Sequence, residues 1–242
     1  MSAEDGFGGR LPCGRWSVWR YNWLANRLVV RSLERARRHA RGTLLDVGCG
    51  ARPFAPLFRG HARRYVGLDR PGSPELRLPL PDLYGDASAL PFRDGAFDTL
   101  LTLSVLNFLP HPGRGLAEMR RVLAPDGVLI AEFVQSAPRY PAYPDLWRFS
   151  RGAVDRLLRE AGLEAVEVHS VGRRPTAAGL EALARLNRIN RGPWRPLTEL
   201  PVRALYAIVQ LAAAALDPLF ARSSDVVTHV VVARRAAAPA GS

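Results

Sequence analysis

An aspartate and a glycine turn at the end of an apolar run are the first residues that suggest a ligand site. In "LLDVGCGARPFAPLF", residues 44–58, Asp46 lies just before Gly48 and Gly50, and a helical pattern follows. Glycines after a strand let a ligand approach the backbone closely. The dinucleotide fingerprint G-x-G-x-x-G has a third glycine where this chain has Pro53, which offers no N–H to a phosphate. With the carboxylate of Asp46 nearby, the pattern favours a less anionic ligand.

Two further aspartates suggest what that ligand contains. Asp69 ends the apolar run "YVGLD", 21 residues after Gly48. In an open α/β sheet this is the place of a carboxylate that accepts both hydroxyls of a ribose. Asp86 follows the next expected strand and can accept from an exocyclic adenine amine, while Ala87 offers its backbone N–H to a ring nitrogen. Together these residues predict a nucleoside site without a pyrophosphate.

The elements around these residues predict an α/β fold. From Thr43 onward, β-type runs alternate with helical patterns, which is typical of a parallel sheet with helices on both faces. The expected strands are "TLLDV", "RYVGLD", "FDTLLTL", "GVLIAEFV", "EAVEVHSV" and "DVVTHVVVA", and the expected helices lie near 53–59, 114–124 and 151–161. We divide the chain into an N-terminal helical lid segment 1–41 with Trp16, Trp19 and Trp23, a cofactor-binding core 42–174, a helical insertion 175–222, and a final strand and tail 223–242.

Composition narrows the classes of protein and of partner. The chain has 242 residues, 48% of them hydrophobic, which is enough for one large α/β core. Its net charge of +12 comes from arginines without any lysine. We interpret this charge first as a solvated basic surface, with an anionic substrate, a membrane surface or RNA as the alternatives, and we expect no nucleic acid. Cys13 and Cys49 lack disulfide or zinc spacing, and the first residues lack an apolar signal segment, so a cytoplasmic location is expected. The uncharged run 204–216 is shorter than the roughly 20 residues of a membrane span.

The order of the motifs resembles class I S-adenosylmethionine-dependent methyltransferases of the small-molecule type, with a methyltransferase-11-like domain. The resemblance covers roughly residues 43–170 and is carried by Leu45–Gly50, Val66–Asp69, Asp86–Ala87 with Leu90–Phe92, Phe97–Asp98 and Arg121–Gly127. It implies a Rossmann-like, mostly parallel sheet of seven strands with helices on both faces and an antiparallel last strand. It also implies that Asp46 and the turn 48–50 lie by the amino-acid end of S-adenosylmethionine, Asp69 by its ribose, and Asp86 and Ala87 by its adenine. We add Cys49, Arg70, Leu103 and, from the lid, Tyr21 to this cofactor site.

Departures from the family pattern concern the acceptor. Many relatives carry Glu-His after the fourth strand, where this chain has Asn107 and Phe108, and His111 is a candidate replacement for that histidine. The Asn/Asp-Pro-Pro-aromatic turn of DNA and protein amide methyltransferases is missing, which disfavours exocyclic base amines as acceptors. The loop "RYPAYPDLWRFS" is expected to form the acceptor wall, because loops at the carboxyl ends of the strands line the crevice. Our substrate-binding candidates are Asn107, Tyr140, Tyr143, Asp145, Trp147 and Arg148, and our catalytic candidates are Tyr140, Tyr143 and His111.

The resemblance implies methylation of an oxygen or nitrogen in a small molecule, such as a specialised metabolite or a glycan or lipid precursor. Two alternatives stay open: a cyclisation or rearrangement that uses the sulfonium as a fixed charge, and a non-catalytic binding protein on the same fold. No metal is expected, because no ligand set with metal spacing follows the fourth strand. The segment 201–220 is expected to roof the acceptor pocket, to contact a second subunit of a homodimer, or to rest on a bilayer surface without spanning it.

Overall fold

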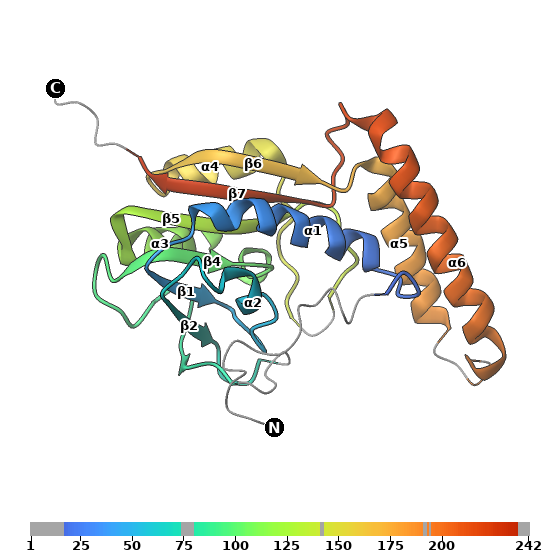
Figure 1. The fold of residues 1–242 in the computed structure, drawn as a ribbon, viewed down its shortest axis with the longest axis horizontal. Helices are drawn as coiled ribbons and strands as arrows, with labels where there is room; N and C mark the ends of the chain where they lie inside the picture. The colour runs from blue at the N-terminus through green and yellow to red at the C-terminus, as the bar shows by residue number, and fades with distance from the viewer. Residues whose placement is uncertain (1–16, 74–79, 141–142, 191–192, 194, 237–242) are drawn as a thin grey trace.

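A computed structural model describes residues 17–73, 80–140, 143–190, 193 and 195–236, so Trp16 and the first part of the expected lid lie outside it. Seven strands form one sheet in the order β3-β2-β1-β4-β5-β7-β6 (Figure 1). Strand β7 pairs antiparallel with both β5 and β6, and the other pairs are parallel. This confirms the predicted fold class. The strands are β1 Thr43–Val47, β2 Arg64–Asp69, β3 Leu83–Tyr84, β4 Phe97–Thr102, β5 Leu123–Val134, β6 Leu163–Val171 and β7 Thr228–Arg235.

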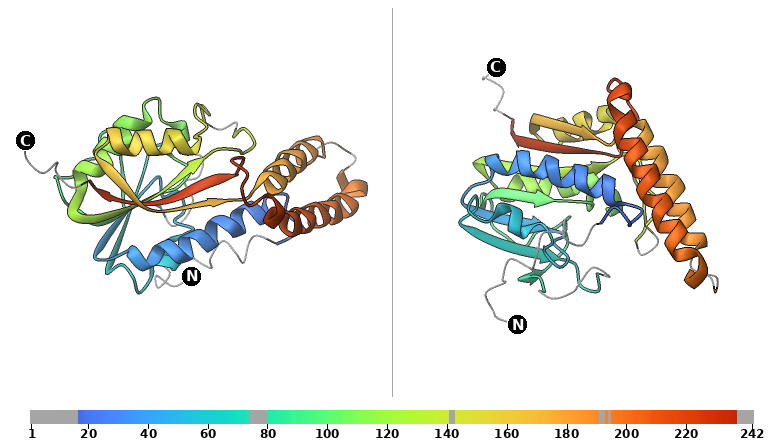
Figure 2. Two further views of the ribbon diagram at one scale, coloured as in Figure 1. Left: turned by 90° about the horizontal axis from the view of Figure 1, so that it is seen from above. Right: turned by 45° about the vertical axis from the view of Figure 1, so that its right-hand side comes forward.

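Helices cover both faces of this sheet. In Figure 2, α1 and α4 lie on opposite sides of it. The helices are α1 Trp23–Ala36, α2 Ala55–Phe58, α3 Pro112–Val122, α4 Arg151–Glu160, α5 Arg174–Ile189 and α6 Arg195–Leu216, with 3₁₀ turns at Arg37–His39, Leu106–Phe108 and Asp217–Phe220. The expected helices near 114–124 and 151–161 are therefore present with shifted ends. The expected helix 53–59 is shorter, because it begins only after Arg52–Phe54 have formed a turn.

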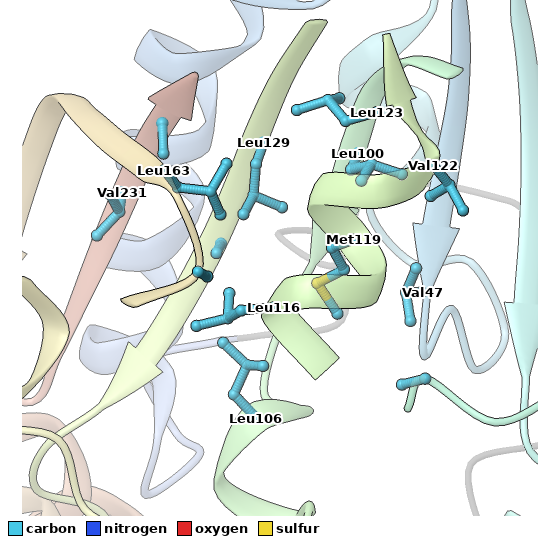
Figure 3. Close-up of a cluster of buried hydrophobic side chains, with 14 of the residues drawn as sticks. Val47, Leu100, Leu106, Leu116, Met119, Val122, Leu123, Leu129, Leu163 and Val231 are labelled. Atoms are coloured by element: carbon cyan, nitrogen blue, oxygen red, sulfur yellow. The ribbon is translucent and has the colours of Figure 1, made fainter. Parts of the chain in front are cut away.

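Alternating strand residues build two hydrophobic layers. Leu44 and Leu101 face the layer under α1 and α2, whereas their neighbours Leu45 and Leu100 face the layer under α3 and α4. Successive side chains on a strand point to opposite faces, so apolar residues at neighbouring positions predict a strand that is buried on both sides. Figure 3 shows the second layer, with Leu116, Met119 and Val122 of α3 among the labelled side chains.

A pair of long helices extends beyond the end of the sheet. Helices α5 and α6 lie side by side in both views of Figure 2 and pack against each other. Helix α5 follows β6 directly, and the chain leaving α6 returns to begin β7. Since β6 runs parallel to β1, β2, β4 and β5, this helical pair leaves the sheet at the edge where those strands have their carboxyl ends.

Candidate functional site

A cavity of about 900 Å³ opens at the carboxyl ends of β1, β2, β4 and β5. Parallel strands end at a common edge, and open α/β sheets bind ligands in the crevice there. The cavity brings together most of the predicted site residues from segments far apart in the sequence. They are Gly48, Asp69, Arg70, Asp86, Ala87, Leu103, Asn107, His111, Tyr140, Tyr143, Asp145 and Arg148.

The glycine turn is shaped by its backbone. Gly48 has a φ of 78° and Gly50 a φ of 50°, which L side chains rarely adopt. A Cβ on Gly48 would also lie 2.2 Å from Cγ2 of Val105, so no side chain fits between the turn and the loop after β4. The backbone N–H of Gly48 donates to the carbonyl of Leu68 at 2.8 Å, which holds the turn against the end of β2. The backbone of Gly48 therefore lines the cavity wall, with no side chain between it and a ligand.

Asp69 connects this turn to the site. Its side chain is buried, and its two oxygens accept from the backbone N–H groups of Gly50 and Arg70, each at 2.7 Å. A carboxylate oxygen has a second lone pair, so both oxygens can still accept from neighbouring hydroxyls. Asp86 is exposed and Ala87 is buried beside it, and both lie in the cavity wall as a nucleoside base would require.

Three residues that we expected at the cofactor lie behind the wall. Asp46, Cys49 and Gly50 are buried and do not line the cavity. Burial raises the pKa of Asp46 to about 7, although the hydroxyl of Tyr65 donates a hydrogen bond to it. Burial also raises the pKa of the Cys49 thiol far above its usual range, so this cysteine is not a nucleophile. Asp46 lies on the central strand β1, and Cys49 and Gly50 lie in the buried part of the turn that follows it.

Arg52 closes the rear of the turn, and our sequence analysis did not single it out. It has a φ of 53°, and its buried guanidinium pairs with Asp82 at 2.9 Å. Its side chain lies so close to Gly67 that a Cβ on that glycine would be 3.0 Å from Nε of Arg52. Its positive charge lowers the pKa of the Asp46 carboxyl and so opposes the effect of burial.

The opposite wall is aromatic. The ring of Tyr143 stacks on Phe108 with centroids 4.7 Å apart and on Tyr140 at 5.6 Å. The guanidinium of Arg70 lies 4.4 Å from the centre of the Tyr143 ring. The Tyr143 hydroxyl and Ser73 Oγ are 2.6 Å apart, which is hydrogen-bond distance. Tyr143 therefore links the loop after β2, on the nucleoside side, to the loop that we expected to hold the acceptor.

Charged and polar groups complete this wall. Arg148 donates to Asp145, and this hydrogen bond keeps the pKa of Asp145 below its usual range. The Asn107 side chain is also hydrogen-bonded to Asp145, while its buried Oδ1 has no hydrogen-bond partner among the described residues. Trp147 lies outside the cavity wall, where its indole N–H donates to the carbonyl of Leu109 at 2.8 Å. Trp147 thus holds the loop, and Phe149 docks in the core as expected.

Tyr21 lies away from the cavity. Its ring packs edge to face against Tyr206 of α6, with centroids 6.5 Å apart, in a small separate gap between α1, α5 and α6. Helix α1 packs on β6 and β7, and its start is bound to Gln210 of α6. This tertiary contact turns Tyr21 towards α6 instead of the cofactor.

Two residues that sequence reasoning missed form a polar pair under the cavity. Ser104, directly after β4, has a φ of 54° and lines the cavity. Its hydroxyl donates to Glu132 at 2.7 Å, and burial raises the pKa of Glu132. The sequence did contain a signal for this pair, because Glu132 interrupts the apolar run "GVLIAEFV". Burying a carboxylate is costly, so a glutamate inside a buried strand indicates a polar partner or a function. Tyr84 and Arg114 are further wall residues that the sequence did not reveal.

Comparisons with known proteins agree with this geometry. Residues 45–131 match the family model of the methyltransferase domain. The chain is similar to phthiotriol/phenolphthiotriol dimycocerosates methyltransferase 1 of Mycobacterium ulcerans, with 40% identity over 36% of this chain and 35% of that protein. It is also similar to the ubiquinone/menaquinone biosynthesis C-methyltransferase UbiE of Bordetella avium, with 46% identity over 32% of this chain and 30% of the relative.

The two alignments span about a third of the relatives' length, 35% and 30%. Among solved structures, the [4+2]-cyclase SpnF has a similar fold, with a TM-score of 0.52 and 20% identity over 90% of this chain and 80% of its own. At that identity the likeness concerns the fold alone.

Proposed function

We propose that this chain transfers a methyl group from S-adenosylmethionine to a small-molecule acceptor, since its residues 45–131 match the family model of the methyltransferase domain. One observation carries the proposal. A single cavity of about 900 Å³ joins a nucleoside side, formed by Asp69, Asp86 and Ala87, to an aromatic wall around Tyr143. Small-molecule sites range from about 300 to 1,000 Å³, so this cavity has room for both a cofactor and an acceptor.

The residues present fit such a cofactor. Gly48 leaves open backbone where a Cβ would collide with Val105, and Asp69 keeps lone pairs for two hydroxyls. When bound, S-adenosylmethionine supplies a methyl carbon that its sulfonium makes electrophilic. Asp46 does not reach the cavity, so we place the amino-acid end of the cofactor against the backbone of the glycine turn, with the carboxylate of Asp46 behind it.

The chain's part in the reaction is to position the acceptor and to exclude water. Tyr140 and Tyr143 provide rigid aromatic surface with a hydroxyl each. Asn107 Oδ1, buried without a partner among the described residues, is placed to accept from an acceptor N–H or O–H after a small side-chain movement. Tyr140, Tyr143 and His111 remain our candidates for taking a proton from the acceptor.

The names of the relatives favour methyl transfer over the alternatives. Both aligned relatives are called methyltransferases, one acting on phthiotriol and phenolphthiotriol dimycocerosates and one in quinone biosynthesis. The cyclase SpnF supports only the shared fold. A rearrangement would leave S-adenosylmethionine intact, whereas methyl transfer converts it to S-adenosylhomocysteine, so release of S-adenosylhomocysteine with a true acceptor distinguishes the two.

Cofactor binding is tested by the substitution Asp69→Ala. Loss of a carboxylate that accepts two ribose hydroxyls should weaken S-adenosylhomocysteine binding by about 1.5–3 kcal/mol, or ten- to a hundredfold. Isothermal titration calorimetry measures this affinity. The matched control is Asp155→Ala, which removes an exposed carboxylate on α4 that pairs with Arg151. Equal affinities of the Asp69→Ala variant and the unsubstituted protein would contradict the assignment of Asp69.

A further inference from the structure

One side of α6 exposes a continuous apolar surface. Leu197, Leu200, Ile208 and Leu211 are 78%, 81%, 63% and 56% exposed, and Leu219 in the following 3₁₀ turn is 78% exposed. Isolated exposed leucines are common, but a contiguous row marks an interaction site. We call this surface the outer face of α6. It consists of Leu197, Leu200, Pro201, Ala204, Leu205, Ile208, Leu211, Ala212, Ala215, Leu216 and Leu219.

Helical spacing separates this face from every charged residue of α6. Positions 197, 201, 204, 208, 211 and 215 are three or four residues apart and therefore lie on one side of the helix. Arg195, Glu199 and Arg203 are offset from that row and lie on the other side, where Glu199 pairs with both arginines. The outer face thus carries apolar groups alone along the whole length of the helix.

Hydrogen bonds hold α6 on the body of the protein, so this face keeps its orientation. Gln210 accepts from Leu24 N at 2.9 Å and donates to the carbonyls of Val18 and Arg20 at 3.1 and 2.9 Å. Asp217, just after α6, accepts from the backbone N–H groups of Arg173 and Thr176, each at 3.1 Å. Because α6 is hydrogen-bonded to the rest of the protein at these two places, its outer face can bind a partner without a change in the fold.

Length and composition alone would also allow Arg195–Phe220 to cross a membrane, and 22% of its most apolar window is buried. From the sequence we considered only the uncharged run 204–216, which is too short to span a bilayer. The helical stretch Arg195–Phe220 has 26 residues and is long enough. Gln210 and Asp217 lie within the stretch and bind the body of the protein. A span would have to break these contacts, whereas docking along the surface preserves them.

The charge of the chain indicates what covers the outer face. A second copy would bring another net charge of +12, and like charges oppose association. The helical pair itself, residues 174–222, has seven arginines and only three acidic residues. Arg185, Arg188 and Arg222 are exposed on it. An apolar helix face on a helical pair with an excess of basic residues is the pattern of a helix that lies in the interface of an anionic bilayer.

We propose that the outer face of α6 docks this protein on an anionic membrane surface, with the helix lying in the plane of the interface. The helical pair leaves the sheet at the same edge where the cavity opens. The carboxylate of Glu181 on α5 helps Asp145 to raise the pKa of the cavity residue Arg148, so the helical pair lies close to the cavity wall. The docked orientation therefore places the cavity on the side of the molecule that carries the membrane contact.

Vesicle flotation with the full chain tests this proposal. The probes are vesicles of phosphatidylcholine alone and of phosphatidylcholine with about 30 mol % phosphatidylglycerol. The unsubstituted protein should float with the anionic vesicles and much less with the neutral ones. Ile208→Ser should lower the partition coefficient about three- to tenfold, and Ile208→Ser with Leu211→Ser at least about tenfold.

The matched control is Val166→Ser, which removes an apolar side chain of β6 that is 49% exposed, away from α6. This variant should float like the unsubstituted protein. Circular dichroism confirms that each variant is folded, which exposed substitutions should leave unchanged. Equal binding to neutral and anionic vesicles would overturn the proposal, as would unchanged flotation of the double variant. A dimer that Ile208→Ser dissociates, without vesicle binding, would show that a second copy covers this face.

Discussion

At the scale of single residues, Tyr143 is the side chain whose position has the clearest consequence for activity. Its ring stacks between Phe108 and Tyr140, and its hydroxyl lies 2.6 Å from Ser73 Oγ. Tyr143→Phe keeps the stacked ring and removes the hydroxyl. We expect turnover with the true acceptor to fall about tenfold or more, because loss of one hydrogen bond misplaces the acceptor loop, while cofactor affinity stays nearly the same.

Steady-state kinetics and calorimetry with S-adenosylhomocysteine separate these two effects. Tyr140→Phe is the second variant at this wall, and Tyr84→Phe is the matched control, since Tyr84 lines the cavity beside Asp86 on the nucleoside side. Unaltered kinetics in both wall variants would mean that the acceptor lies elsewhere in the cavity.

The residues that could be predicted from the sequence are those that follow strands. Asp69 ends an apolar run and Asp86 follows β3, and the position of a strand end sets which edge a side chain reaches. Ser104 and Arg52 could not be found in this way, because their roles depend on positive φ values that only the folded turns impose. The pairing of Ser104 with Glu132 joins residues 28 positions apart, and no local pattern encodes that contact.

At the scale of elements, Gln210 joins α6 to the start of α1. Its side chain makes one hydrogen bond to the Leu24 N–H and donates to the carbonyls of Val18 and Arg20. Gln210→Ala leaves these groups without their partner in a buried place. We expect the free energy of unfolding to fall by about 2–4 kcal/mol, because each unsatisfied buried group costs about 1–3 kcal/mol. Urea denaturation measures the change.

The neighbouring variant Leu211→Ala serves as the control for Gln210→Ala. Leu211 is 56% exposed, so its truncation should change the unfolding free energy by no more than about 0.5 kcal/mol. Similar losses in the two variants would show that α6 contributes to stability through its apolar surface and not through the hydrogen bonds of Gln210.

The strands could be predicted well from the sequence because both layers of the core require continuous apolar runs. The runs 43–47 and 64–69 match β1 and β2 residue for residue. Strand β3 is reduced to Leu83–Tyr84, both of which are exposed, so no apolar run marks it. The direction of α5 and α6 depends on contacts at Gln210 and Asp217, which are polar residues within an apolar stretch. The hydrophobic periodicity of the sequence therefore predicts that α5 and α6 are helices but not how they pack on the rest of the protein.

At the scale of the whole molecule, two different surfaces lie at the carboxyl end of the sheet. The apolar residues of α6 and the acceptor loop are in the same half of the chain, but one lies on the outside of the helical pair and the other lines the cavity. Both are attached to the carboxyl edge of one sheet. The proposed membrane contact and the proposed cofactor site therefore lie at the same end of the molecule but are formed by different residues.

The stability of the whole chain should respond to pH through two buried groups that act in opposite directions. Burial raises the pKa of Asp46 from 3.8 to about 7, so the folded state holds a proton that the unfolded state has lost. Stability from this group therefore falls between about pH 4 and pH 7, by about 4 kcal/mol in total. Burial lowers the pKa of His229 from 6.5 to about 4, so the unfolded state binds the extra proton and stability rises with pH between those values.

Because these two effects largely cancel between pH 4 and 6.5, the substitution Asp46→Asn should reveal them. An asparagine resembles the protonated carboxyl but does not titrate. The variant therefore lacks the decrease in stability that Asp46 causes as pH rises, and it keeps the increase that His229 causes. Its free energy of unfolding, relative to that of the unsubstituted protein, should increase by a few kcal/mol as pH rises from about 4 to 7 and then stay constant. Urea denaturation across this range measures the difference, and Glu160→Gln at the exposed end of α4, where Glu160 pairs with Arg156, should show no such trend. A difference that is independent of pH would mean that Asp46 is ionised in the folded protein throughout, and that its hydrogen bond from Tyr65 outweighs its burial.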